Sequence, residues 1–477
     1  MKKTALYAAL AAIVVLAGCA VTGPAQTVPA GAPAAWYAPL PHDGKLQDLS
    51  AWWAQFDDAL LVAIVDAAQA ANPTVASARS RIEQARASRV AAGAALGPTL
   101  DASASASRGN TQPPAPLATV VQAGLQTAWE IDLFGGLRAG AAAAQSRFEG
   151  AQAGWHDARV AVAAEAATAY VTLRTCQRQL AVSDNDARSR AETARLSDLS
   201  AQAGFTAPAD AALARASAAE SAARAKQQRA QCELDVKALV ALTAIPEPQL
   251  RERLAAPWKE PTGVASLGVA TVPAQVLAQR PDVYQAEREV AAASADVGTA
   301  RAQRFPRVTL AGSLAVGRAR LGGSDTNVQT WSIGPLAVSL PLLDGGRRAA
   351  NVDAAQARYD EAVALYTARV RQAVREVEQA LVNLDSARQR GDDARAAADG
   401  FRAALRATQA RYDSGLASLV ELEEVRRTFL AAETALVTLQ REDLTAWIAL
   451  YRALGGGWPG PVARAAASVS TSSPSSP

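Results

Sequence analysis

The feature that most constrains this chain is a run of 67 residues, 347 to 413, that contains no proline. Its larger apolar residues recur every three, four or seven positions from Val352 to Leu384, which is the spacing of one face of an α-helix. A helix of this length extends about 100 Å at roughly 1.5 Å per residue. No ordinary globular domain needs such a rod, so we predict one continuous helix that stops at Gly415.

A second proline-free run of the same length, 137 to 203, stops at Gly204. Two such rods indicate an internal duplication. Four landmarks recur in one order at offsets of 208 to 211 residues: Pro73 and Pro281, Pro98 and Pro306, Gly135 and Gly345, and Gly204 and Gly415. The chain is therefore predicted to consist of two tandem copies of one unit.

Each copy contains two segments in which the pattern changes to a period of two. In residues 99–108, Leu100 and alanines alternate with hydroxyls or Asp101, as in a strand with one apolar and one polar face. The predicted strands lie at about 99–108, 119–132, 307–317 and 328–341. Each pair precedes a long helix, 137–203 or 347–413, and a return helix, 209–243 or 418–454. The predicted fold class is mainly α with a smaller β portion.

The remaining segments surround the two repeats, 72–243 and 280–454. Residues 19–71 are predicted to form a tether and a first helix, in which apolar residues from Trp52 to Val65 have helical spacing. An equatorial connecting segment rich in proline, 244–279, joins the repeats. The tail, 455–477, ends in a run of serine and proline and is predicted to be largely disordered.

The N-terminus has the pattern of an export signal. Lys2 and Lys3 precede an apolar run that is shorter than the ~20 residues of a membrane-spanning helix. The sequence Leu16-Ala17-Gly18-Cys19 resembles the lipobox of bacterial lipoproteins. We therefore expect cleavage of the signal peptide 1–18, a covalent lipid on Cys19 and, with Ala20 next, sorting to the outer membrane. No other stretch is apolar enough for a membrane helix.

Cys176 and Cys232 are the other two cysteines, and export places them in an oxidising compartment. Their midpoint is Gly204, so folding back at that glycine would bring them to the same height. Either they form a disulfide across a helical hairpin, or they are two small buried thiols on unrelated faces.

Composition excludes several classes of function. A net charge of +3 over 477 residues provides no basic field for nucleic acid. The only histidines are His42 and His156, and no nucleophile-elbow, metal-ligand or phosphate-loop motif occurs. We predict neither an enzyme nor a metal protein, and no cofactor other than the lipid on Cys19.

Strands of about ten residues match the height of an outer-membrane barrel wall. Four strands cannot close a barrel, and open edges are not tolerated in lipid. The alternatives are two solvent-exposed hairpins or a barrel assembled from several chains, of which three would supply twelve strands.

The sequence also contains a set of family motifs. They are Trp129-Glu130-Ile131-Asp132-Leu133-Phe134-Gly135, Arg280-Pro281-Asp282-Val283, Ala300-Arg301-Ala302 with Phe305-Pro306, Leu340-Pro341-Leu342 before Asp344-Gly345-Gly346, and Leu450-Tyr451-Arg452-Ala453-Leu454-Gly455-Gly456-Gly457-Trp458. Together they resemble the outer membrane efflux protein family, the TolC-like channels, and its lipoprotein branch in tripartite pumps. The resemblance implies a homotrimer with a twelve-stranded β-barrel and a twelve-helix periplasmic tunnel. It also implies a periplasmic adaptor protein and an inner-membrane transporter of the RND type as partners.

The family closes its tunnel at the periplasmic tip, and the resemblance assigns gate residues here. Asp210 and Tyr412 match a pair that holds the closed gate by hydrogen bonding between neighbouring hairpins. Glu421 and Glu424 match acidic positions, and three copies would form two carboxylate rings that attract cations. The alternative is a solvated acidic helix start. The family's basic residue two positions after the second turn glycine is here Ala417, a departure that puts the full closed network in doubt.

The predicted function is a passive gated conduit that exports small molecules such as drugs across the periplasm and outer membrane. The alternatives are a lipid-anchored helical-hairpin adaptor or structural protein without a pore, and an outer membrane duct for type I protein secretion. An adaptor hairpin would be expected once, whereas this chain repeats its hairpin, each time after a strand pair. That repetition favours the conduit.

Overall fold

The computed structural model describes residues 21–29, 31–33, 36–38, 52–110, 117–259, 277, 280–321 and 324–458. Several predictions lie outside these residues: the signal peptide 1–18, the lipidation site Cys19, most of the tail, and the parts of the tether and connecting segment that fall in the gaps.

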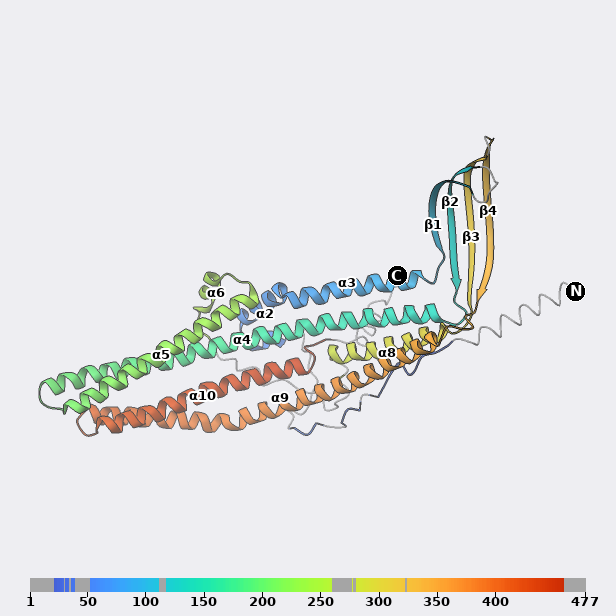
Figure 1. Ribbon diagram of the computed structural model, residues 1–477. Helices are drawn as coiled ribbons and strands as arrows, with labels where there is room; N and C mark the ends of the chain where they lie inside the picture. Colours follow the sequence, from blue (N-terminus) through green and yellow to red (C-terminus); the bar gives the residue numbers. More distant parts are fainter. Residues whose placement is uncertain are drawn as a thin grey trace, which may run out of the picture. The chain divides into compact units, whose positions relative to one another are not determined.

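The two longest helices are α4 (Gly136–Gln202) and α9 (Arg347–Asp413), each 67 residues long. Helix α9 has the predicted bounds, and α4 begins and ends one residue before them. Each is followed by a glycine turn and a return helix, α5 (Pro208–Thr243) or α10 (Leu419–Ala453). Figure 1 shows each return helix running back beside its long helix. Both proline-free runs are therefore single helices.

The shorter helices are η2 (Trp52–Phe56), α2 (Ala59–Ala71), α3 (Pro73–Ala94), α6 (Glu247–Leu254) and α8 (Pro281–Ala302). The prediction of one helix from Trp52 to Val65 is wrong. Asp57 has a φ of +49°, which ends η2, and the Asp58 carboxylate then caps α2 by accepting the amides of Leu60 and Leu61. Helix α6 was not predicted, although its prolines lie at the helix start, where no amide is needed.

Among the described residues, no single helix has the length and apolar composition of a membrane span. Helices α2 and α3, bent by 51° at their junction, meet those criteria only as a pair.

The four strands form one antiparallel sheet in the order β1-β2-β3-β4 (Figure 1). They are β1 (Thr99–Gly109), β2 (Ala118–Ile131), β3 (Arg307–Leu321) and β4 (Ser324–Ser339). Strand β2 of the first repeat pairs with β3 of the second, so the repeats share one sheet. A mainly helical fold with a small antiparallel sheet is confirmed.

The second hairpin is longer than predicted, because polar residues obscure the alternation near its turn. Arg318 in β3 forms a 2.9 Å ion pair with Asp325 in β4, and the ladder continues to the Leu321–Ser324 pair. The register shifts between Leu310 and Gly312, opposite the segment that contains Pro335. Proline has no N–H to donate, so a position beside an irregularity on the outermost strand suits it.

The described part of the chain divides into two compact units. The first comprises Met1–Ala30, Arg79–Gly154 and Tyr284–Arg369, and contains the sheet. The second comprises Gly31–Ala78, Trp155–Val283 and Val370–Pro477, and contains both hairpin turns. Helices α4 and α9 contribute residues to each unit.

The core of the second unit contains a group of aromatic side chains. Trp52 is fully buried, stacks on Tyr451 with 5.6 Å between ring centroids and lies 6.2 Å from Trp447. Burial among these rings raises the pKa of Tyr451 to about 12. Leu173, Leu239 and Leu381 extend the core along α4, α5 and α9. The first helical segment thus packs against the C-terminal helix.

Candidate functional site

The two hairpin turns have the same local structure. Gly204 and Gly415 have φ of +80° and +72°, a conformation that glycine adopts without strain. The next residue, Phe205 or Leu416, donates its amide to the carbonyl five residues earlier, at 2.9 and 2.8 Å. These bonds complete the last turn of α4 and α9. The side chains of Phe205 and Leu416 are exposed, which leaves one apolar residue at each tip.

The predicted gate carboxylates lie at the helix starts that follow these turns. Pro208 is the first residue of α5, and Asp210 lies in the first turn of that helix. Ser418 caps α10, because its hydroxyl accepts the amide of Glu421 at 3.1 Å. The positive end of each helix dipole favours a carboxylate at these positions.

Each acidic residue of the predicted filter lies beside an arginine. Glu421 forms a 2.7 Å ion pair with Arg411, and Glu424 forms a 2.6 Å ion pair with Arg427. The side chains of Glu421 and Glu424 are 41% and 56% exposed. The two arginines offset part of the charge of these carboxylates.

The structure does not bring the predicted pair Asp210 and Tyr412 together within one chain. The Tyr412 hydroxyl lies 3.2 Å from the Ser197 hydroxyl on α4, and its ring packs against the apolar cluster of Ala194, Ala214 and Leu419. Among the described residues, the Asp210 side chain has no hydrogen-bond or ion-pair partner. A bond between Asp210 and Tyr412 would therefore require neighbouring copies of the chain.

Cys176 on α4 and Cys232 on α5 are joined by a disulfide, and their Cα atoms are 5.6 Å apart. Each lies 28 residues from Gly204. The first of the two alternatives drawn from the sequence is therefore present in the structure, and the disulfide fixes α4 against α5 well away from the turn.

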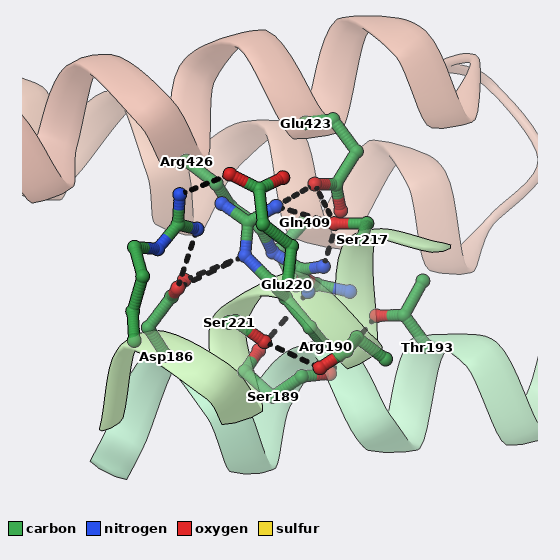
Figure 2. Close-up of polar contacts among 12 residues, drawn as sticks. Asp186, Ser189, Arg190, Thr193, Ser217, Glu220, Ser221, Gln409, Glu423 and Arg426 are labelled. Carbon is green, nitrogen blue, oxygen red and sulfur yellow. Dashed lines mark hydrogen bonds and ion pairs between the residues drawn. The ribbon is translucent and has the colours of Figure 1, made fainter. Parts of the chain in front are cut away.

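A buried polar cluster connects the two hairpins near their turns. We call it the Arg190–Glu423 cluster; its members are Asp186, Ser189 and Arg190 on α4, Ser217 on α5, Gln409 on α9, and Glu423 and Arg426 on α10. Figure 2 shows Arg190 between the two hairpins, with Glu423 approaching it from α10. Arg190 forms ion pairs with Glu423 and, at 3.0 Å, with Asp186.

The second arginine of the cluster is equally well partnered. Arg426 donates to Glu423 at 3.0 Å, to Ser189 at 3.0 Å and to Gln409 at 2.7 Å. The Arg190 and Arg426 side chains are only 7% and 3% exposed. Two arginines and two carboxylates make the cluster neutral, as buried charges require.

Sequence reasoning missed this cluster, although α10 carried a signal. Leu419, Leu422 and Arg426 are buried at helical spacing, so an arginine occupies a position of the apolar stripe. A charged residue at such a position indicates a buried partner on another helix. No comparable signal identifies Arg190, whose partner lies 233 residues away.

The described residues contain no group of three or more His, Cys, Asp or Glu that could hold a metal ion.

Comparisons with known proteins agree with this architecture. The model of the outer membrane efflux protein family matches residues 64–244 and 272–456. Outer membrane protein OprJ of Pseudomonas aeruginosa is 31% identical over 480 residues, which cover 96% of this chain and 97% of OprJ. The solvent efflux pump outer membrane protein SrpC of Pseudomonas putida is 29% identical over 464 residues, covering 94% of this chain and 97% of SrpC.

The similarity extends to solved structures. The outer-membrane channel OprN matches with a TM-score of 0.82 and 30% identity, covering 91% of this chain and 99% of that one. The Campylobacter jejuni CmeC outer membrane channel matches with a TM-score of 0.79 and 27% identity, covering 92% of this chain and 95% of that one. The sheet, the paired hairpins and the sequence therefore all match those of outer membrane channel proteins. The chain belongs to the outer membrane efflux protein family.

Proposed function

We propose that this chain forms the outer membrane channel of a tripartite efflux pump, a passive gated conduit for small molecules such as drugs. The observation that carries the proposal is the exposed apolar face of the sheet. Residues directly opposite each other on adjacent strands share a face, so Ala102, Leu125, Leu314 and Trp331 lie together. The side chains of Leu125, Leu314 and Trp331 are 41%, 53% and 76% exposed.

The other face of the same sheet is polar. The register places Asp101, Gln126, Ser313 and Ser332 in one row across the four strands. A broad exposed apolar face is unfavourable in water. Facing lipid on one side and an aqueous lumen on the other removes that cost, as in the wall of a membrane barrel.

Strands β1 and β4 are the two edges of this sheet, so each has an unpaired side within the described chain. Open edges are not tolerated in lipid, and closure therefore needs further copies. Three copies would give the twelve-stranded barrel and twelve-helix tunnel, and the internal repeat supplies the register. Transferring the Thr127–Gly312 pairing of β2 and β3 to β4 and the next copy's β1 places Val338 opposite Ala104 of that copy.

The trimer is tested by introducing a cysteine pair, Ala104→Cys with Val338→Cys. We expect oxidation to link neighbouring chains into species that end at three chains, measured on non-reducing gels and by mass in detergent. The control pair, Ala104→Cys with Ala337→Cys, should not cross-link, because a shift of one residue moves the side chain to the other face. A stable monomer in detergent would refute the assembly.

Contacts of the N-terminal segment support a lipid on Cys19. The amide of Val21 donates to the Phe134 carbonyl, just beyond the end of β2, at 3.2 Å. The carbonyl of Pro24, three residues after Val21, accepts a hydrogen bond from the Ser294 hydroxyl at 2.7 Å. Val21 thus lies at the foot of the sheet, two residues after Cys19 in the sequence. Acyl chains attached there would enter the membrane that holds the strands.

We place the gate at the hairpin turns. In a closed trimer, Asp210 of one copy would bond to Tyr412 of the next, and Glu421 and Glu424 would line the constriction. The exposed Phe205 and Leu416 at the tips would contact the periplasmic adaptor, which connects the channel to an inner-membrane transporter of the RND type. Relatives named for solvent and pyoverdine export favour small organic cargo.

Replacing Glu421 and Glu424 with glutamine is expected to reduce the cation preference of the channel several-fold, since carboxylates at a constriction concentrate cations. Reversal potentials in planar bilayers under a salt gradient measure this preference. Arg427→Gln is the matched control, because it removes the charge that offsets Glu424. It should change the preference in the opposite direction. Unchanged selectivity in the glutamine variant would remove both residues from the filter.

A further inference from the structure

The Arg190–Glu423 cluster has contacts of two kinds, those that cross between the hairpins and those that stay within one. Three interactions cross: the ion pair of Arg190 with Glu423, the 2.6 Å bond from the Ser217 hydroxyl to Glu423, and the 3.0 Å bond from Arg426 to Ser189. All three lie between α4 or α5 and α10 (Figure 2).

Within each hairpin, every charge keeps a partner of its own. Arg190 is paired with Asp186 four residues earlier on α4, and Arg426 is paired with Glu423 three residues earlier on α10. Arg190 also donates to Ser217 on α5, and Arg426 donates to Gln409 on α9. Separating the hairpins would therefore leave one neutral ion pair on each side.

This division has an energetic consequence. Breaking a buried ion pair is usually prohibitive, because it leaves an uncompensated charge. Here separation costs one ion pair and two hydrogen bonds, and water can satisfy the exposed groups without any charge losing its partner. An apolar contact of the same size would instead keep the two hairpins together, because separating them would expose apolar surface to water.

Between the cluster and the two turns, the hairpins meet in a small apolar contact and one hydroxyl pair. Ala194 on α4 and Ala214 on α5 pack against Leu419, and Tyr412 reaches Ser197. Alanine side chains bury little area, so these contacts contribute weakly. The cluster is thus the principal polar link between the hairpins near their turns.

We propose that the Arg190–Glu423 cluster is a reversible latch that holds α9–α10 against α4–α5, and that its release opens the gate. The inference rests on the channel function proposed above and deepens it. It names residues inside one chain, whereas the pair Asp210 and Tyr412 would act between copies.

Glu423→Gln tests the latch. The variant removes the one ion pair of the cluster that crosses between the hairpins; Arg190 keeps Asp186, and Arg426 keeps its bonds to Ser189 and Gln409. We expect the ratio of open to closed time in single-channel recordings to rise about tenfold or more, the factor that corresponds to losing one charge-assisted contact. If this variant does not fold, Ser217→Ala removes a crossing hydrogen bond and must shift the ratio in the same direction.

Glu192→Gln is the matched control. Glu192 lies on α4 close to the cluster, and it forms an ion pair with Arg195 on its own helix, where both side chains are more than half exposed. The charge change is the same, but no contact between hairpins is lost. The control should gate like the unmodified channel.

A covalent link tests the opposite direction. Ser217→Cys with Glu423→Cys, bridged by a short thiol cross-linker, should keep the channel closed until the bridge is cleaved. An unchanged gating ratio in Glu423→Gln, in a channel that still conducts, would overturn the latch and leave the channel function intact. An unmodified protein that forms no channel in bilayers would overturn both.

Discussion

Replacing Arg280 with alanine is expected to lower the free energy of unfolding by about 3–5 kcal/mol, the cost of breaking a buried ion pair. Arg280 is 4% exposed and forms 2.7 Å ion pairs with both Asp282 and Glu376. It also donates to the Ala453 carbonyl at 2.7 Å, the last residue of α10. Truncation removes the donor to this carbonyl and leaves the Glu376 carboxylate with only the amide of Gln372. Denaturant unfolding followed by tryptophan fluorescence measures the loss.

The charge of Arg280 persists at all accessible pH values. Burial alone would lower its pKa, but Asp282 and Glu376 outweigh burial and raise the pKa above the ordinary value. Arg390→Ala is the control, because the Arg390–Glu442 pair at 2.7 Å is exposed on both sides. That change should cost less than about 1 kcal/mol. Equal losses in the two variants would mean that the ion pairs of Arg280 contribute no more than surface pairs.

The helical framework was predictable because its signals are long and local. A proline-free run with one apolar stripe fixes α9 over the bounds Arg347–Asp413, and a glycine with positive φ ends it. The recurrence of landmarks such as Gly204 and Gly415 required no knowledge of contacts. Elements that repeat within one chain are therefore recoverable without a structure.

Short elements were less predictable, since single residues decide them. Asp57 interrupts the first helix through its backbone conformation, and nothing in the apolar spacing of that segment marks the break. In β4, the residues before Val328 are polar, so the sequence pattern did not indicate that the strand begins at Ser324. Backbone hydrogen bonds to β3 and the Arg318–Asp325 ion pair hold this end of the strand. An alternating pattern arises only where one face of a strand is apolar. A strand end with polar residues on both faces shows no such pattern, so its bounds cannot be predicted from periodicity.

The site was predictable only in part, because its chemistry depends on pairing across the fold. The resemblance pointed to Glu421 and Glu424, whereas the least exposed acid of the same helix turn is Glu423. Its side chain projects from the opposite side of α10, where Arg190 lies. Which of three acidic residues in one turn meets a partner is set by the rotation of the helix, and a resemblance of motifs leaves that rotation open.

Removing the disulfide by Cys176→Ala with Cys232→Ala is expected to lower the free energy of unfolding by about 4 kcal/mol in the chain-entropy model. The two cysteines are 56 residues apart, so the bond closes a long loop. Denaturant unfolding by tryptophan fluorescence, with and without reductant, measures the effect. Reductant should destabilise the unmodified protein and leave the double variant unchanged. If the denaturant midpoint of the unmodified protein did not change on reduction, the disulfide would not restrict the conformational entropy of the unfolded chain, and the prediction would be wrong.

The disulfide also distinguishes the two hairpins. The repeat offset places Ala387 and Asp443 where the first hairpin has Cys176 and Cys232, so the second hairpin has no such covalent link. We therefore expect α4 and α5 to stay together while α9 and α10 move, and reduction should lower stability without changing conductance. Planar-bilayer recordings before and after reduction measure this. A rise in conductance on reduction would instead mean that the first hairpin belongs to the moving part.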